Sequence, residues 1–176
     1  MRPFPSLLVV PAAVAIAALQ TQAPTALKVE FNKENVVASR LEGRWVPHAE
    51  LGARLGSHTK PNESIVFRSE KEPAFFSKLP AAAAKSLAKS GPIYLAGTLQ
   101  WVGWDGLEHP FVLVSHIGNP HVVLFRARGG DPLGDAESCN LSLIPALDPK
   151  NDLLFVGGDF NNEPFRSYQR APETAK

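Results

Sequence analysis

Three histidines form the most suggestive set of metal-binding side chains in the sequence: His109, His116 and His121. His116 and His121 flank residues 117–120, which are predicted to form a hairpin turn, and His109 lies on the incoming strand. Histidines on neighbouring strands can face each other and bind zinc. A zinc site needs at least a third ligand, which the sequence does not identify, and hairpin histidines bonded to backbone or water are the favoured alternative. We therefore predict neither a metal ion nor another cofactor.

A second set of candidate residues, Gly158-Asp159-Phe160-Asn161, follows the apolar run 153–156. It resembles the Gly-Asp-Phe-Asn motif of the exonuclease/endonuclease/phosphatase superfamily, and this resemblance implies that Asp159 and Asn161 hold a metal ion and the attacked phosphate. Metal-assisted phosphodiester cleavage also needs further carboxylates and a general-base histidine. The sequence has no Ser-Asp-His after this motif and no upstream Gln-Glu element. The hydrolase is therefore kept as an alternative, and a turn between the last two strands is the simpler interpretation.

Strands must position these side chains, because turn signals separate short segments of alternating polarity from Pro92 onward. The short local connections and the lack of a βαβ rhythm favour a mainly β fold, an antiparallel up-and-down barrel of about eight strands. The predicted strands are 41–46, 63–68, 93–102, 111–116, 121–128, 141–146, 152–156 and 164–170.

The other segments are predicted to be helices or loops. A helical insertion is expected over 73–90, because Pro73 suits a first helical position, apolar residues recur at helical spacing and Gly91 can end the helix. Pro80 should divide this insertion into two pieces. Residues 52–62 and the acidic stretch 129–137 are predicted to be loops, and Asn32–Arg40 one or two helical turns.

The N-terminal segment has the pattern of a secretory signal, with a positive Arg2, an uncharged apolar run over 7–19 and small or polar residues after it. We predict a signal peptide over 1–23, cleaved at an uncertain point between about Leu19 and Ala26. The remaining predicted boundaries are a spacer over 24–31, a barrel domain over 32–171 and a disordered tail over 172–176. The protein would be exported, to the periplasm or outside the cell, with no membrane span after cleavage.

Charge and cysteine content exclude several classes of partner and site. Without the signal peptide, Lys plus Arg falls from 18 to 17 and balances the 17 acidic residues. This near-neutral chain lacks the clustered basic excess that nucleic-acid binding uses, so no nucleic acid is expected as a partner. Cys139 is the single cysteine, which excludes an intrachain disulfide and a thiolate metal cluster, and a buried free thiol is expected.

Two short motifs, one on the first and one on the last predicted strand, carry a family resemblance. Gly43-Arg44-Trp45 on the first strand and Tyr168-Gln169-Arg170 on the last resemble the lipocalin-like members of the calycin superfamily, especially small exported bacterial domains. The resemblance covers about residues 32–170. It implies that Gly43, Trp45, Tyr168 and Arg170 close the bottom of the barrel, with the Arg170 guanidinium packed on the Trp45 indole.

In such a barrel, a ligand would lie inside or at the open mouth, because an eight-stranded wall leaves room for packed side chains or for one small molecule. The candidate lining residues are Tyr94, Leu99, Trp101, Phe111 and Phe125. The expected function is non-enzymatic binding of a small hydrophobic molecule, or of a partner, at the open end. The alternatives are the hydrolase described above and a structural or interaction module with a filled core.

Overall fold

The computed structural model describes residues 36–55, 60–103, 105–116, 119–129, 131–157 and 166–172 of the 176-residue chain. The predicted signal peptide and spacer, and the candidate motif at 158–161, lie outside the described residues. Most of the predicted tail lies outside them as well.

The described chain consists of eight strands, three α-helices and two short 3₁₀-helices. In chain order these are α1 (Val36–Arg40), β1 (Gly43–Pro47), α2 (Ala49–Leu55), β2 (Ser64–Ser69), η1 (Ala74–Lys78), α3 (Ala81–Lys89), β3 (Ile93–Val102), β4 (Glu108–His116), β5 (Asn119–Arg128), β6 (Asp131–Ile144), η2 (Pro149–Asn151), β7 (Leu153–Gly157) and β8 (Arg166–Arg170).

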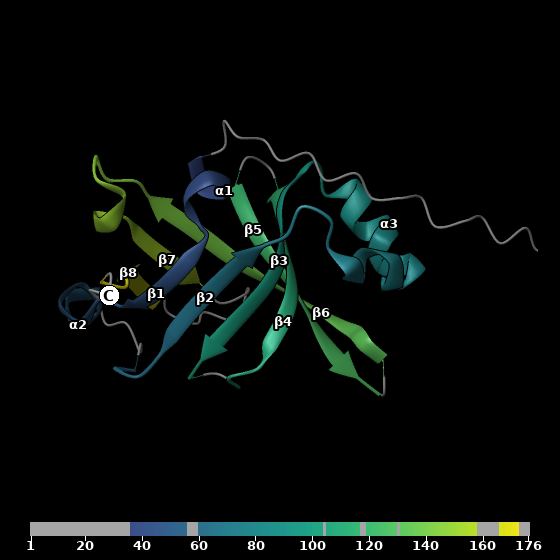
Figure 1. Cartoon of the computed structure of the whole chain (residues 1–176), viewed down its shortest axis with the longest axis horizontal. Helices are drawn as coiled ribbons and strands as arrows, with labels where there is room; N and C mark the ends of the chain where they lie inside the picture. The colour runs from purple at the N-terminus through teal and green to yellow at the C-terminus, as the bar shows by residue number, and fades with distance from the viewer. Residues whose placement is uncertain are drawn as a thin grey trace, which may run out of the picture.

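The eight strands form a closed antiparallel barrel in simple sequence order (Figure 1). Each strand pairs with the next along the chain, and β8 returns to pair with β1. The closing register places Trp45 opposite Arg170 and Pro47 opposite Tyr168. The predicted mainly β, up-and-down barrel of about eight strands is therefore confirmed.

The predicted helical insertion is also present, and Pro80 separates η1 from α3. Two predicted loops are corrected by the structure. Residues 52–55 belong to α2, in which the Gly52 N–H donates to the His48 carbonyl at 2.8 Å and the His48 ring Nδ1 accepts from Leu51 N–H at 3.2 Å. The acidic stretch 129–137 is mostly strand, because β6 begins at Asp131 and runs for 14 residues. Its acidic side chains are tolerated there because Arg126 on β5 lies opposite Asp135.

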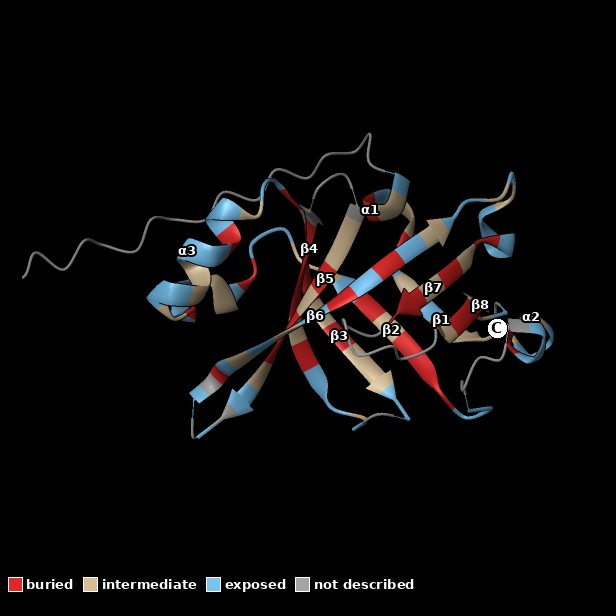
Figure 2. Ribbon diagram, turned by 180° about the vertical axis from the view of Figure 1, so that it is seen from behind, coloured by how far each residue is buried: buried red, intermediate tan, exposed pale blue. Residues whose placement is uncertain are grey.

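The interior of the barrel is filled by apolar side chains from every strand. Burial alternates along the strands, as expected when one face of a sheet is turned inward (Figure 2). Phe67 and Phe111 meet edge to face with their ring centroids 5.4 Å apart. The fully buried side chains of this interior cluster include Leu41, Trp45, Ile65, Phe111, Leu113, Leu124, Leu154 and Tyr168.

A second apolar cluster lies on the outer face of β3, β4 and β5, beneath the helical insertion (Figure 1). Leu79 and Leu87 pack there with Val112 and Phe125, and the Phe75 and Phe125 ring centroids are 5.8 Å apart. The central strands are therefore buried on both faces. This explains why β4 and β5 carry longer apolar runs than a strand with one solvated face.

Among the described residues, no helix has both the length and the apolar character that crossing a bilayer requires.

Candidate functional site at the open end of the barrel

One end of the barrel is closed by Trp45 and Arg170. The Arg170 guanidinium carbon lies 4.1 Å from the centroid of the Trp45 ring, and the Trp45 Nε1–H donates to the Leu41 carbonyl at 2.8 Å. The same guanidinium donates to the carbonyl oxygens of Arg40 and Glu42. Because Ala38 and Leu41 belong to the interior cluster, α1 and the residues after it cover this end. We call it the closed end.

Gly43 is required at the closed end by both its backbone and its surroundings. Its φ is +113°, which L side chains rarely adopt, and an added Cβ would lie 3.0 Å from the Arg170 Nη1. The glycine of the Gly-x-Trp motif therefore leaves room for the guanidinium that stacks on the tryptophan.

Asp152 connects the closed end to the turn before β7. It is fully buried, its Oδ1 lies 3.1 Å from the Arg40 Nη1, and its Oδ2 lies 3.9 Å from the Arg170 Nη2. The Ala146 N–H donates to the same Oδ1 at 2.9 Å. Two arginines from α1 and β8 thus share one buried carboxylate.

The opposite end, which we call the open end, carries polar side chains on its inner wall. β2, β4 and β8 begin at this end and β3 finishes there. The Glu63 side chain is 2% exposed, and its Oε2 accepts from the Tyr168 hydroxyl at 3.1 Å. Its Oε1 lies 3.8 Å from the Arg166 Nη1, and the Arg166 guanidinium carbon lies 5.1 Å from the centroid of the Trp101 ring.

The Glu63 side chain lies close to the backbone of Gly103. Gly103 has a φ of +101°, and a Cβ there would lie 2.3 Å from the Glu63 Cγ. A side chain at position 103 would therefore displace the Glu63 carboxylate from the inner wall.

Tyr168 is expected to stay un-ionised well into alkaline solution. Burial, and then the negative charge of Glu63, raise the pKa of Tyr168 far above its ordinary value of 10.0. A raised folded-state pKa means that this contribution to stability is complete below about pH 10 and is lost as the pH rises further. The measurement is the free energy of unfolding in urea between pH 8 and 11, together with phenolate absorbance.

Tyr168→Phe is the control for this prediction. It removes the phenol while keeping the ring, and the lysines titrate in the same range in both proteins. Wild type should lose more stability than Tyr168→Phe above pH 10. Equal losses would show that Tyr168 ionises as freely in the folded state as in the unfolded state.

A second polar group at the open end centres on His109 and Arg126. The buried His109 lies on the inner face opposite Leu99, and its Nε2 lies 2.6 Å from the Asp105 Oδ2. Desolvation acts to raise the pKa of Asp105, but the Leu107 N–H, the hydrogen bond with His109 and the charges of His109 and Arg126 together hold it below its ordinary value. Asp105 therefore stays ionised beside His109.

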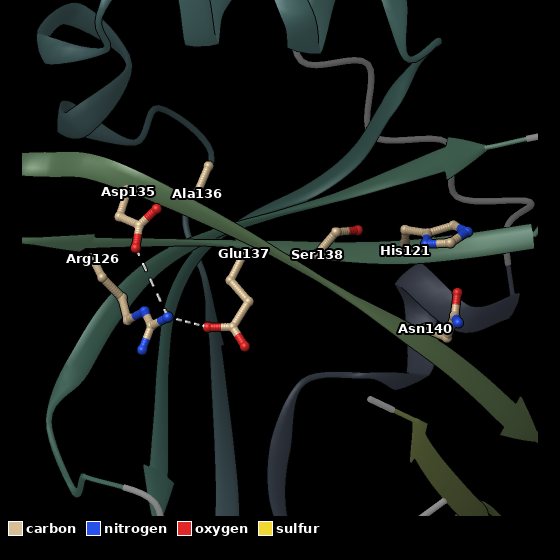
Figure 3. Close-up of a pocket in the computed structure, with 7 residues that line it drawn as sticks. All are labelled: His121, Arg126, Asp135, Ala136, Glu137, Ser138 and Asn140. Atoms are coloured by element: carbon tan, nitrogen blue, oxygen red, sulfur yellow. Dashed lines mark ion pairs between the residues drawn. The ribbon is translucent and has the colours of Figure 1, made fainter. Parts of the chain in front are cut away.

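Arg126 also lines a groove that follows β6 (Figure 3). Its guanidinium pairs with Glu137, and it lies 4.0 Å from the Asp135 Oδ2. The groove has a volume of about 430 Å³, and its lining includes Ser138 and Asn140 on the other side of β6. Because the lining residues alternate between the two faces of β6, the groove is open to solvent and is not an enclosed small-molecule site.

A small cavity lies among the described side chains of the interior cluster, below the open end. The cavity among Ile65, Leu99, Trp101 and the neighbouring apolar side chains measures about 10 Å³. Such a cavity has room for about one water molecule. This cavity is therefore too small for a ligand larger than a water molecule.

No protein-family model, curated protein or solved structure matches this chain. The function is therefore inferred from the closed barrel and from the contacts of the residues at its two ends.

The predicted lining residues are placed on two different faces. Leu99 and Phe111 are buried in the interior cluster, and Tyr94 and Trp101 pack against it while partly exposed. Phe125 points to the outer face and packs under the helical insertion, so it does not line the interior. The change of face follows from the β5 alternation, in which Val122 and Leu124 are the inward residues.

The three candidate histidines are not placed as the zinc-site possibility requires. The register places His121 opposite Val114 and His116 opposite Asn119, so His116 and His121 are not directly opposite each other. His109 lies on the inner face at the open end, whereas His121 alternates to the outer face of β5. The His116 side chain lies outside the described part of the structure. Within the described residues, no three His, Cys, Asp or Glu side chains are grouped so that they could hold a metal ion.

Asp159 and Asn161 of the hydrolase alternative lie outside the described residues, and the segment that contains them joins the antiparallel neighbours β7 and β8. The alternative therefore stays a prediction.

Glu63 and Arg166 are not among the site residues predicted from the sequence. The alternation of inward and outward residues along each strand could have identified both as inward-facing. Glu63 shares the inward face with Ile65 and Phe67. Arg166 shares it with Tyr168 and Arg170. Tyr168 was assigned to closure, but its hydroxyl reaches toward the open end and bonds Glu63.

Proposed function

We propose that the protein is an exported, non-enzymatic, lipocalin-like barrel that binds a small amphipathic molecule at its open end. The observation that carries this proposal is the buried Glu63 carboxylate, which faces Arg166 and Tyr168 directly above the filled interior. Buried charged groups are costly unless they are paired, and they concentrate where a protein binds or reacts. Polar groups at the end of an apolar interior suit a ligand with a polar head.

The surface of the open end can also receive an apolar group. Val102 is 38% exposed at the end of β3, and Leu107 is 63% exposed just before β4. Trp101 precedes Val102 but lies on the opposite, inner face of β3, where its ring contacts Arg166. A ligand chain lying over Val102 and Leu107 at the rim would bury apolar surface without entering the barrel, which gains about 25 cal/mol per Å².

The proposal is tested with three eight-carbon probes that differ only in the head group: octanoate, octanol and octylamine. We expect saturable quenching of tryptophan fluorescence by at least one probe below its aggregation concentration, and loss of that quenching in Trp101→Phe. Trp101→Phe keeps an aromatic ring and leaves the other tryptophans as an internal reference. If none of the three probes gives a saturable change that depends on Trp101, the filled-core structural module is favoured instead.

Two other parts of the proposal have direct tests. Export predicts that protein recovered from the periplasm or medium begins between about Leu19 and Ala26, as N-terminal sequencing would show. Magnesium-dependent phosphodiester cleavage that disappears in Asp159→Ala would overturn the non-enzymatic assignment in favour of the hydrolase.

A further inference from the structure

The Arg166 side chain occupies a small site of defined chemistry at the open end. One wall is the face of Trp101, whose centroid lies 5.1 Å from the guanidinium carbon. The other is the Glu63 carboxylate, whose Oε1 lies 3.8 Å from the Arg166 Nη1. An aromatic face combined with a desolvated carboxylate is an arrangement that binds organic cations.

Glu63 requires a positive charge in this site. Its side chain is 2% exposed, and an unpaired carboxylate at that depth would lose most of its hydration energy. The Tyr168 hydroxyl donates one hydrogen bond to it, but a phenol supplies no charge. Arg166 supplies a positive charge beside Glu63, so a cationic molecule that displaced Arg166 would keep the carboxylate paired.

The contact between Arg166 and Glu63 is longer than a direct hydrogen bond. The 3.8 Å separation of Nη1 and Oε1 exceeds the roughly 2.7–2.9 Å of a charge-assisted hydrogen bond. The Arg166 side chain is 26% exposed and belongs to the first residue of β8, so it has a route to solvent. A mobile cation could approach Glu63 more closely than a side chain tethered to the β8 backbone.

We propose that Trp101 and Glu63 form a binding site for an organic monocation, an alkylammonium or a guanidinium, and that Arg166 is the internal occupant displaced by the ligand. This inference rests on the proposed function, since it selects the cationic head group among the ligands that the open end could bind. It also defines the role of Trp101, which supplies the aromatic face for the head group.

The experiment is chemical rescue of Arg166→Ala in the full chain, with Arg166→Gln as a second variant if the first folds poorly. The probe is methylguanidinium at millimolar concentrations, compared with sodium chloride at equal ionic strength. We expect a saturable rise in the melting temperature and a saturable change in tryptophan fluorescence. The apparent affinity should be at least tenfold tighter than in wild type, where the probe must displace Arg166.

Two matched variants identify the site. Arg68→Ala removes an arginine from the exposed pair with Glu108, whose side chains are 50% and 53% exposed, and should gain no response to methylguanidinium. Adding Glu63→Gln to the Arg166 variant removes the carboxylate and should abolish the rescue. An equal response in Arg68→Ala, an equal response to sodium chloride, or no response in either Arg166 variant would each overturn the cation site.

This result can be separated from the test of the proposed function. Saturable, Trp101-dependent binding of octanoate together with failed rescue would uphold binding at the open end and overturn the cation site. Successful rescue without binding of any eight-carbon probe would uphold the cation site and overturn the amphipathic ligand.

Discussion

Replacing Trp45 with alanine is expected to lower the free energy of unfolding by about 3–5 kcal/mol, the range for truncation of a large buried aromatic side chain. Trp45 is 0% exposed, and the mutation removes the indole hydrogen bond to the Leu41 carbonyl. It also removes the ring beneath Arg170, whose guanidinium would then face a cavity. Urea denaturation followed by circular dichroism measures the loss.

Leu147→Ala is the control for Trp45→Ala. Leu147 is apolar but fully exposed in the connection before η2, so its truncation should change stability by no more than about 0.5 kcal/mol. A loss below about 1 kcal/mol in Trp45→Ala would contradict the proposed role of this side chain in closing the barrel.

The alternation of strand residues allowed most of the fold to be predicted. Residues 93–102 show the clearest pattern, and the structure places β3 over the same residues. This strand was easy to recognise because apolar residues alternate along it and Pro92 precedes it. Alternation could not predict the pairing of β1 with β8, since the two strands are far apart in the sequence. The resemblance of their two motifs indicated it, and the register places Trp45 opposite Arg170.

The first half of β6 could not be predicted because its stabilising partner lies on another strand. Asp131, Asp135 and Glu137, with nearby glycines, have the composition of a loop. In the folded chain, Arg126 pairs with Asp135 and Glu137 across the β5–β6 ladder, which offsets the cost of placing acids on a strand. Local sequence cannot show which strand supplies such a partner.

Whether the barrel is hollow was also outside the reach of the sequence. The same apolar residues could line a cavity or fill it, and the outcome depends on how large side chains from opposite walls meet. Phe67 and Phe111 come from different strands and meet edge to face in the centre, leaving about 10 Å³. The cavity between these side chains is too small for an apolar ligand, which is why we propose an amphipathic ligand that stays at the open end.

Phe125 and Arg166 show two reasons why the face of a strand residue is hard to predict from its hydrophobicity. Phe125 is as buried as an interior residue, but α3 and η1 cover the outer face and bury it there. Hydrophobicity alone cannot distinguish these two cores. Arg166 is charged yet faces inward, because the inner wall at the open end carries the Glu63 carboxylate.

Replacing Asp152 with alanine is expected to cost about 3 kcal/mol of stability. Removing one partner of a buried ion pair typically costs about 3–5 kcal/mol because the other partner stays desolvated. The lower end applies here, since the Arg40 and Arg170 side chains keep 29% and 17% of their exposure. The same substitution leaves the Ala146 N–H without its acceptor. Thermal and urea denaturation measure the loss.

Glu108→Ala provides the matched control, because it removes an acid from the exposed pair with Arg68 and should cost less than about 1 kcal/mol. Asp152→Asn separates charge from shape, since the amide oxygen can still accept from the Ala146 N–H. If Asp152→Asn is nearly as destabilising as Asp152→Ala, the carboxylate acts through its charge on the two arginines, and the guanidinium that lies over Trp45 depends on Asp152 for its position. A cost below 1 kcal/mol in Asp152→Ala would mean that the backbone carbonyls alone hold Arg170 at the closed end.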